Sequence, residues 1–266
     1  MNSTRLLFLL MVVMFIGGCE KKQTESTEPI KSPGPTKSTE PTDSIHQAVA
    51  EDNIAKIQLH VSSGTDIDAR DEALQTQLHQ AALDGQKDVV ELLLARGADI
   101  NSKDDEGSTA LHRATEKHHT DVAELLLAKG AEVNAKTTDK EETPLMWAAY
   151  YGYNDVAELL IAKGADINAT DNEGATALHR ATEKHRTDVV GLLLAKGADV
   201  NAKTDGKETP LIWAAYYGYH DIAELLIAKG ADINVKDQLG QTPLVVAKEK
   251  GREEIVSLLR KYGAKE

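Results

Sequence analysis

The feature that most constrains the fold of this 266-residue chain is a repeat of sequence segments at a fixed interval. The segment TPLMWAAYYGY begins at Thr143 and returns from Thr209 as TPLIWAAYYGY, and AELLIAKGADIN occurs from Ala157 and again from Ala223. Related segments start 33 residues apart, except for one interval of 34 residues before Thr143. A fixed period of this size predicts a repeat array, in which each unit buries its apolar face against its neighbours.

Each unit predicts two short helices joined by a turn and followed by a loop. Thr143 and the proline after it suit the start of the first helix, because proline lacks only an amide that is unpaired there. Acidic pairs such as Asp155 and Glu158 predict a capping box at the start of the second helix. A positive φ is expected in the turn between the helices, where most units have glycine and two have His118 or His185.

Six segments in the same phase resemble the ankyrin-repeat signature, T-P-L-H-x-A in a unit of about 33 residues. They read TQLHQA from Thr76, TALHRA from Thr109 and Thr176, TPLMWA from Thr143, TPLIWA from Thr209 and TPLVVA from Thr242. One period before Thr76, DSIHQA begins at Asp43 and keeps the motif's histidine. The resemblance implies an all-α ankyrin-repeat solenoid of about seven helix-turn-helix units with β-turn finger loops. The expected units are 43–75, 76–108, 109–142, 143–175, 176–208, 209–241 and 242–266.

Residues 1–18 predict a signal peptide. The run Leu6–Ile16 has eleven apolar residues, fewer than the roughly 20 that a membrane-spanning helix needs. The ending IGGC resembles a bacterial lipobox, and this resemblance implies that the peptide is cut before Cys19 and that Cys19 is lipidated. An ordinary signal peptide with an incidental cysteine and an uncleaved anchor are the alternatives.

Residues 19–42 are expected to contain the lipidated cysteine and a disordered tether. The segment is rich in Ser, Thr, Pro, Lys and Glu, and such segments bury too little apolar surface to fold. The lipobox resemblance implies an exported protein that a lipid anchors to the cell envelope. Glu20 replaces the aspartate that retains Gram-negative lipoproteins at the inner membrane, so we expect the outer membrane, facing the periplasm, if the organism is Gram-negative.

The first helix of the fourth unit has two contrasting faces. At 100° per residue, the small aliphatic residues around Leu145 share one face, and Trp147, Tyr150 and Tyr151 lie opposite. Sibling units place charged residues on that opposite face, and such residues are rarely buried unless paired, so we expect the face to be exposed. The candidate partner-binding residues are Arg113, Glu116, Lys117, Trp147, Tyr150, Tyr151, Arg180, Glu183, Lys184, Trp213, Tyr216 and Tyr217.

Two interpretations of this face stay open. In the ankyrin family this side of the first helix forms, with the finger loops, the concave binding surface, and Tyr and Trp are enriched at binding hot spots. Alternatively, stacked units place Arg113, Trp147, Arg180 and Trp213 in a ladder of cation–π contacts worth about 0.5–1 kcal/mol each. We favour packing for the tryptophans and binding for the tyrosines.

Charge and residue spacing argue against several functions. The net charge of −13 opposes sequence-independent nucleic-acid binding, which needs basic side chains to neutralise phosphates. The adjacent His118 and His119 lack the spacing of metal ligands. The resemblance implies a structural hydrogen-bonding role for the motif histidines, which are His46, His79, His112 and His179. No catalytic residue, metal or cofactor is expected.

The sequence therefore predicts a monomeric, non-catalytic protein–protein interaction module, a scaffold or adaptor with an unidentified protein partner, tethered to a bacterial envelope membrane. The alternative is binding of an envelope glycan or another small ligand on the aromatic concave face.

Overall fold

The computed structural model describes residues 44–265. The predicted signal peptide, Cys19 and the tether lie outside the described residues. Within the described part, the longest helices have nine residues, and none is long and apolar enough to cross a membrane.

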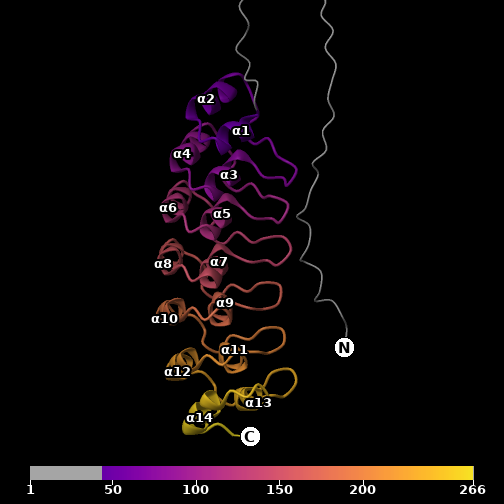
Figure 1. The fold of residues 1–266 in the computed structure, drawn as a ribbon, viewed down its shortest axis with the longest axis vertical. Coiled ribbons are helices and arrows are strands. Elements are labelled where there is room, and N and C mark those ends of the chain that lie inside the picture. Colours follow the sequence, from indigo (N-terminus) through magenta and orange to yellow (C-terminus); the bar gives the residue numbers. More distant parts are fainter. Residues whose placement is uncertain (1–43, 266) are drawn as a thin grey trace, which may run out of the picture. The chain divides into compact units, whose positions relative to one another are not determined.

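The described residues form fourteen α-helices in seven consecutive pairs and contain no strand, which confirms the all-α repeat solenoid. The first helices of the pairs lie between the second helices and the finger loops (Figure 1). The first helices are α1 (Ile45–Ala50), α3 (Gln77–Leu83), α5 (Ala110–Glu116), α7 (Pro144–Tyr151), α9 (Ala177–Glu183), α11 (Pro210–Tyr217) and α13 (Pro243–Glu249). The second helices are α2 (Ile54–Ser62), α4 (Lys87–Ala95), α6 (Thr120–Ala128), α8 (Asn154–Ala162), α10 (Thr187–Ala195), α12 (His220–Ala228) and α14 (Glu253–Lys261).

Threonine begins most of the first helices, as the motif predicts. At α7, Thr143 Oγ1 accepts a hydrogen bond from the Met146 amide, and proline occupies the first turn. At α5 two hydrogen bonds join Thr109 and His112. The Thr109 side chain accepts from the His112 amide, and the Thr109 amide donates to Nδ1 of His112 at 3.2 Å. These contacts satisfy amides that the helix itself leaves unpaired.

The motif histidines join neighbouring units, and their expected structural role is confirmed. Nδ1 of His112 accepts from Thr109, so Nε2 carries the proton and donates to the Glu142 carbonyl, 3.2 Å away at the base of the next finger loop. Burial lowers the pKa of His112 to about 4, against a weaker opposing effect of that hydrogen bond. His79 and His179 make the same two contacts in their own units.

The capping box predicted at the second helices is wrong. Helix α8 begins after Tyr153, and no side chain caps it. The carboxylate of Asp155 instead accepts from Nε2 of His118 at 2.7 Å and from the Thr120 hydroxyl at 2.8 Å. His118 also stacks on Tyr153 at 4.1 Å. The acid therefore joins two units rather than capping its own helix.

The turns between the paired helices adopt the predicted positive φ. Gly152 has a φ of 86°, and His118 takes the equivalent position at 62°. A Cβ on Gly152 would lie 2.7 Å from Cδ of Arg186, so packing as well as backbone geometry favours glycine there.

Leu145, Ala148 and Ala149 are buried, which confirms the predicted inner face of α7. The main contacts of α7 are with α5, α8 and α9, so the core continues from one unit to the next. The finger loops are joined as well: the Thr138 amide donates to Glu106 O at 2.9 Å, and the Asn172 amide donates to Lys140 O at 3.0 Å. Stacked helices and linked loops hold the side chains between them in fixed positions.

Candidate functional surface

Arg113 and Arg180 are largely buried, so the expectation that they lie on an open face is wrong. The Arg113 side chain is 11% exposed, and its Nη2 lies 2.6 Å from the fully buried carboxylate of Asp104 at the base of a finger loop. Burial lowers the pKa of Arg113, but hydrogen bonds from its guanidinium to Asp104, Glu106 and Glu116 outweigh this and raise it. Arg180 pairs with Asp171 in the same way. Each arginine fastens a finger loop to a first helix.

The two tryptophans make a different contact with the finger loops. Trp147 Nε1 donates to the Glu142 carboxylate at 3.1 Å, and Trp213 Nε1 donates to Glu208 at 3.0 Å. The Arg113 guanidinium carbon lies 6.0 Å from the Trp147 ring centroid, which confirms one contact of the predicted ladder. These contacts support the interpretation that the tryptophans mainly serve packing. Arginine and tryptophan alternate as the residues that anchor successive loops.

The four tyrosines of α7 and α11 form two ridges that the loops leave accessible. The first ridge is Tyr150 and Tyr151, and the second ridge is Tyr216 and Tyr217. Tyr150 is 37% exposed and Tyr216 45%, while Tyr151 and Tyr217 are half-buried. In the first ridge the rings of Tyr150 and Tyr151 meet edge to face at 5.3 Å, and in the second Tyr216 and Tyr217 do so at 5.1 Å. Both ridges therefore present preformed aromatic surfaces.

Lysines flank these ridges. Nζ of Lys184 lies 4.5 Å from the Tyr150 ring centroid, and Nζ of Lys250 lies 4.4 Å from that of Tyr216. Lys117 and Lys184 also pair with the glutamates that precede them, Glu116 and Glu183, at 2.9 and 3.0 Å. Lysine and tyrosine thus alternate near the C-terminal ends of successive first helices. We call this row the Lys–Tyr stripe, and its residues are Lys117, Tyr150, Lys184, Tyr216 and Lys250. Sequence reasoning missed Lys250, although it occupies the repeat position of Lys117 and Lys184.

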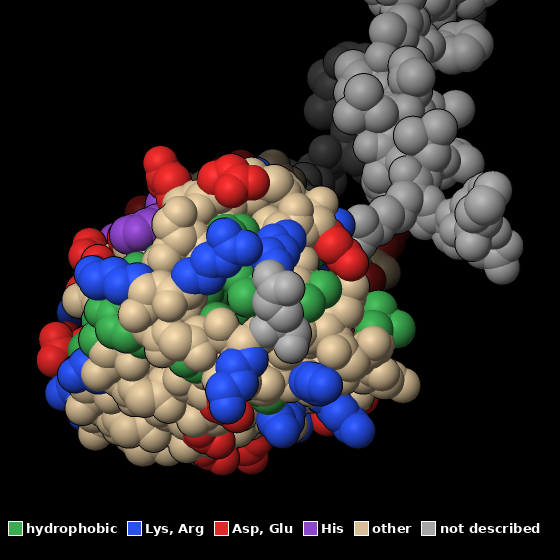
Figure 2. Space-filling view, turned by 90° about the horizontal axis from the view of Figure 1, so that it is seen from below, with side chains coloured by type: hydrophobic (Ala, Val, Ile, Leu, Met, Phe, Trp, Pro, Cys, Tyr) green, Lys and Arg blue, Asp and Glu red, His purple; other side chains and the backbone are tan. Residues whose placement is uncertain are grey.

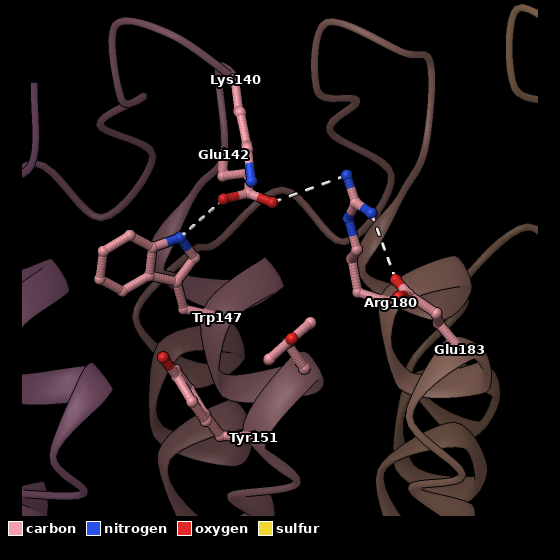
Figure 3. A pocket seen from close by; sticks show the side chains of 7 residues that line it. Lys140, Glu142, Trp147, Tyr151, Arg180 and Glu183 are labelled. Atoms are coloured by element: carbon pink, nitrogen blue, oxygen red, sulfur yellow. Dashed lines mark hydrogen bonds and ion pairs between the residues drawn. The ribbon is translucent and has the colours of Figure 1, made fainter. Parts of the chain in front are cut away.

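A pocket of about 330 Å³ opens between α7, α9 and the finger loop Thr137–Glu142. Figure 3 shows the Glu142 carboxylate between the Trp147 indole and the Arg180 guanidinium, which lie 3.1 and 3.6 Å from its oxygens. The α7–α9 pocket is lined by Lys140, Glu142, Trp147, Tyr150, Tyr151, Arg180 and Glu183. Lys140 and Glu142 were not among the predicted partner-binding residues. The glutamate that precedes Thr143, and again precedes Thr209, was the available signal.

The C-terminal end of the array is a second exposed surface. Viewed from that end, Lys and Arg side chains are spread over the surface with hydrophobic side chains visible between them (Figure 2). Leu239 is 82% exposed and Tyr262 is 42% exposed. The buried Val246 and Leu258 nevertheless close the core of the last unit, so this end resembles a capping repeat.

Among residues 44–265, no group of three His, Cys, Asp or Glu side chains is arranged to hold a metal ion. Exposed His118 and His185 each lie beside an aspartate of the next unit, Asp155 and Asp221. The two histidine–aspartate contacts are the same interaction between neighbouring units, repeated two units apart.

Comparisons with known proteins agree with this architecture. The family model described as ankyrin repeats (3 copies) matches residues 45–137, 135–204 and 200–266. The crystal structure of the ankyrin repeat domain of Bcl-3, described as a unique member of the IkappaB protein family, superposes with a TM-score of 0.72. Its sequence is 30% identical, and the match covers 82% of this chain and 100% of that chain. The comparison with curated proteins finds no match.

The same fold occurs in 655 matching solved chains, so the fold alone does not select a partner. It does define the type of molecule, because ankyrin repeats are typically non-catalytic scaffolds that bind other proteins. With matches along residues 45–266, this chain belongs to the ankyrin-repeat family and is a protein–protein interaction module.

Proposed function

We propose that the protein is a lipid-anchored adaptor that holds a partner protein near a bacterial envelope membrane, and that it binds this partner through the Lys–Tyr stripe. The carrying observation is the exposure of Tyr150 and Tyr216 on neighbouring ridges with lysines between them. Tyrosines offer large contact areas at low entropic cost and are enriched at hot spots.

The surface fits a partner that alternates apolar and polar contacts. Apolar side chains would pack on the ridges, and polar ones would meet Lys117, Lys184 and the glutamates paired with them. Residues 1–42 contain five basic and four acidic residues, so the repeats, from residue 43 onward, carry the whole negative charge excess of the chain. That field favours the approach of a partner with a basic surface.

The proposed anchor rests on the sequence around Cys19. An apolar run, IGGC and a polar segment follow one another in the order that a lipoprotein precursor requires. Several acyl chains on one cysteine give stable membrane binding, where a single chain would be marginal. A location at the outer membrane, facing the periplasm, and a monomeric state are parts of the same proposal.

Site-specific photocrosslinking tests the binding surface. A benzophenone amino acid at Tyr150 or Tyr216 should crosslink one protein partner in the native envelope. The same probe at Lys163 or Lys229, which are exposed beyond the second helices of the same units, should not. Equal crosslinking from all four positions, or crosslinking only from the second helices, would count against this surface.

A further inference from the structure

We infer that the α7–α9 pocket binds one ring of a neutral oligosaccharide. This site goes beyond the proposed protein-binding function: it shares Tyr150 and Tyr151 with the first ridge, but it adds Lys140, Glu142 and Arg180 and does not use the second ridge. At about 330 Å³, the pocket lies at the small end of the range of roughly 300–1,000 Å³ that is typical of ligand sites.

Aromatic side chains supply the platform for such a ring. Trp147, Tyr150 and Tyr151 all line the pocket, and their positions are fixed before any ligand arrives. The Glu142 carboxylate holds the indole of Trp147, and Tyr151 stacks on Tyr153 at 5.5 Å. The C–H faces of a pyranose pack well on flat rings, and a preformed platform reduces the entropy lost on binding.

The charges in the pocket favour a neutral ligand over an ion. Lys140 and Arg180 are basic and Glu142 and Glu183 are acidic, so the lining has no net charge. Arg180 already pairs with both glutamates, at 3.6 and 3.3 Å. An ion of either sign would therefore meet a repelling group. Hydroxyl groups both donate and accept hydrogen bonds, so they fit a lining in which donors and acceptors alternate.

The array also contains a natural control for this site. The second ridge repeats the tryptophan and both tyrosines, but Val246 of α13 occupies the repeat position of Arg180. Val246 is buried and offers no hydrogen bond from its side chain. The second ridge therefore repeats the aromatic residues without a guanidinium donor at this position, and it should bind sugar poorly.

The test is a titration of the full chain with neutral tetrasaccharides, using chitotetraose, cellotetraose, maltotetraose and mannotetraose as probes. A Trp213→Phe background leaves Trp147 as the single tryptophan, because the chain has two. At least one probe should change Trp147 fluorescence saturably, with calorimetry giving the same affinity in the native sequence. Tetragalacturonate, which is acidic, should bind at least tenfold more weakly than the best neutral probe.

Three variants decide whether the ring lies in this pocket. Tyr151→Ala should abolish sugar binding, while the matched Tyr217→Ala should leave it unchanged. If the Tyr151→Ala variant unfolds, the Lys140→Ala variant decides. Because Lys140 is exposed, its replacement should leave the fold intact and lower the affinity for sugar about threefold to tenfold. The inference is wrong if no neutral probe saturates, if the acidic probe binds better, or if Lys140→Ala and Tyr217→Ala have equal effects. Because Lys140→Ala leaves both tyrosine ridges unchanged, its effect on sugar binding is independent of whether the ridges capture a protein partner.

Discussion

Nζ of Lys184, the residue that follows α9, lies 4.5 Å from the centre of the Tyr150 ring on α7, and this contact joins two successive units on the surface that faces solvent. The contact recurs two units later between Lys250 and Tyr216 at 4.4 Å. Exposed cation–π contacts contribute only about 0.5–1 kcal/mol each. They orient the tyrosines more than they stabilise the array, so the ridges remain available to a partner.

Breaking the buried ion pair between Arg113 and Asp104 should strongly destabilise the array. Arg113→Ala leaves the buried carboxylate unpaired, and such losses cost about 3–5 kcal/mol. Lys117→Ala removes the ion pair that the exposed Lys117 makes with Glu116 of the same unit, and it should cost less than about 1 kcal/mol. Urea denaturation followed by circular dichroism measures both. Equal effects of the two substitutions would contradict the role that we assign to Arg113.

Acid should destabilise the array through its buried histidines. Burial lowers the pKa of His112 and His179 from 6.5 to about 4 in the folded chain. The unfolded chain therefore binds more protons below pH 6.5, and stability falls as the pH drops from 6.5 to 4. At pH 5 the loss should be about 2 kcal/mol for each histidine.

Substituting these histidines provides the control for the pH effect. Met146 and Ile212 occupy the same repeat position in the fourth and sixth units. The variant His112→Met, His179→Ile should be less stable at pH 7, because it loses two hydrogen bonds to carbonyl oxygens. Its free energy of unfolding should change less between pH 7 and pH 5 than that of the native chain. An unchanged pH slope would assign the effect to other groups.

Removing one unit should leave a folded array. Deleting Thr143–Ala175 removes one whole period and joins Glu142 to Thr176, where the next unit begins. Because each unit mainly contacts its neighbours, the product should keep its helical circular dichroism and unfold at a lower urea concentration. Complete loss of helical signal would show that the units depend on one shared core.

The repeat period was enough to predict the helices, the turns and the buried face around Leu145, because these features depend on local pattern. Two features could not be predicted in this way. Asp104 lies in a finger loop, and the repeat pattern does not show that the fold buries its carboxylate against Arg113 of the helix that follows the loop. Asp155 looked like a cap, yet it bonds to His118 of the preceding unit.

The α7–α9 pocket was missed for a related reason. It combines a finger loop, α7 and α9, and only the stacking of units brings Lys140 close to Arg180. The helical pattern was enough to predict that the tyrosines share one face. The arginines were expected to be more exposed than they are, because the pattern does not reveal the buried carboxylates that pair with them.

Cys19 should be the point of membrane attachment. Cys19→Ala removes the sulfur that would receive the lipid and should leave unprocessed precursor or release soluble protein. Fractionation of cells and the apparent mass of the protein measure both effects. A Cys19→Ala protein that stays in the membrane fraction at the processed size of the native protein would contradict lipid anchoring.

The affinity of the crosslinked partner for a variant without the tyrosine ridges tests the central claim most directly. Each hot-spot truncation typically costs about 2 kcal/mol or more, or roughly thirtyfold in affinity. Replacing Tyr150, Tyr151, Tyr216 and Tyr217 by alanine should therefore abolish measurable binding by the purified array, while circular dichroism shows it still folded. The matched control should bind as the native chain does. It replaces four exposed residues on or just after the second helices, Glu158, Lys163, Glu224 and Lys229. A folded tyrosine variant that binds the partner with native affinity would place the interaction surface elsewhere, on finger-loop residues such as Asp105, Lys140, Asn172 and Lys207.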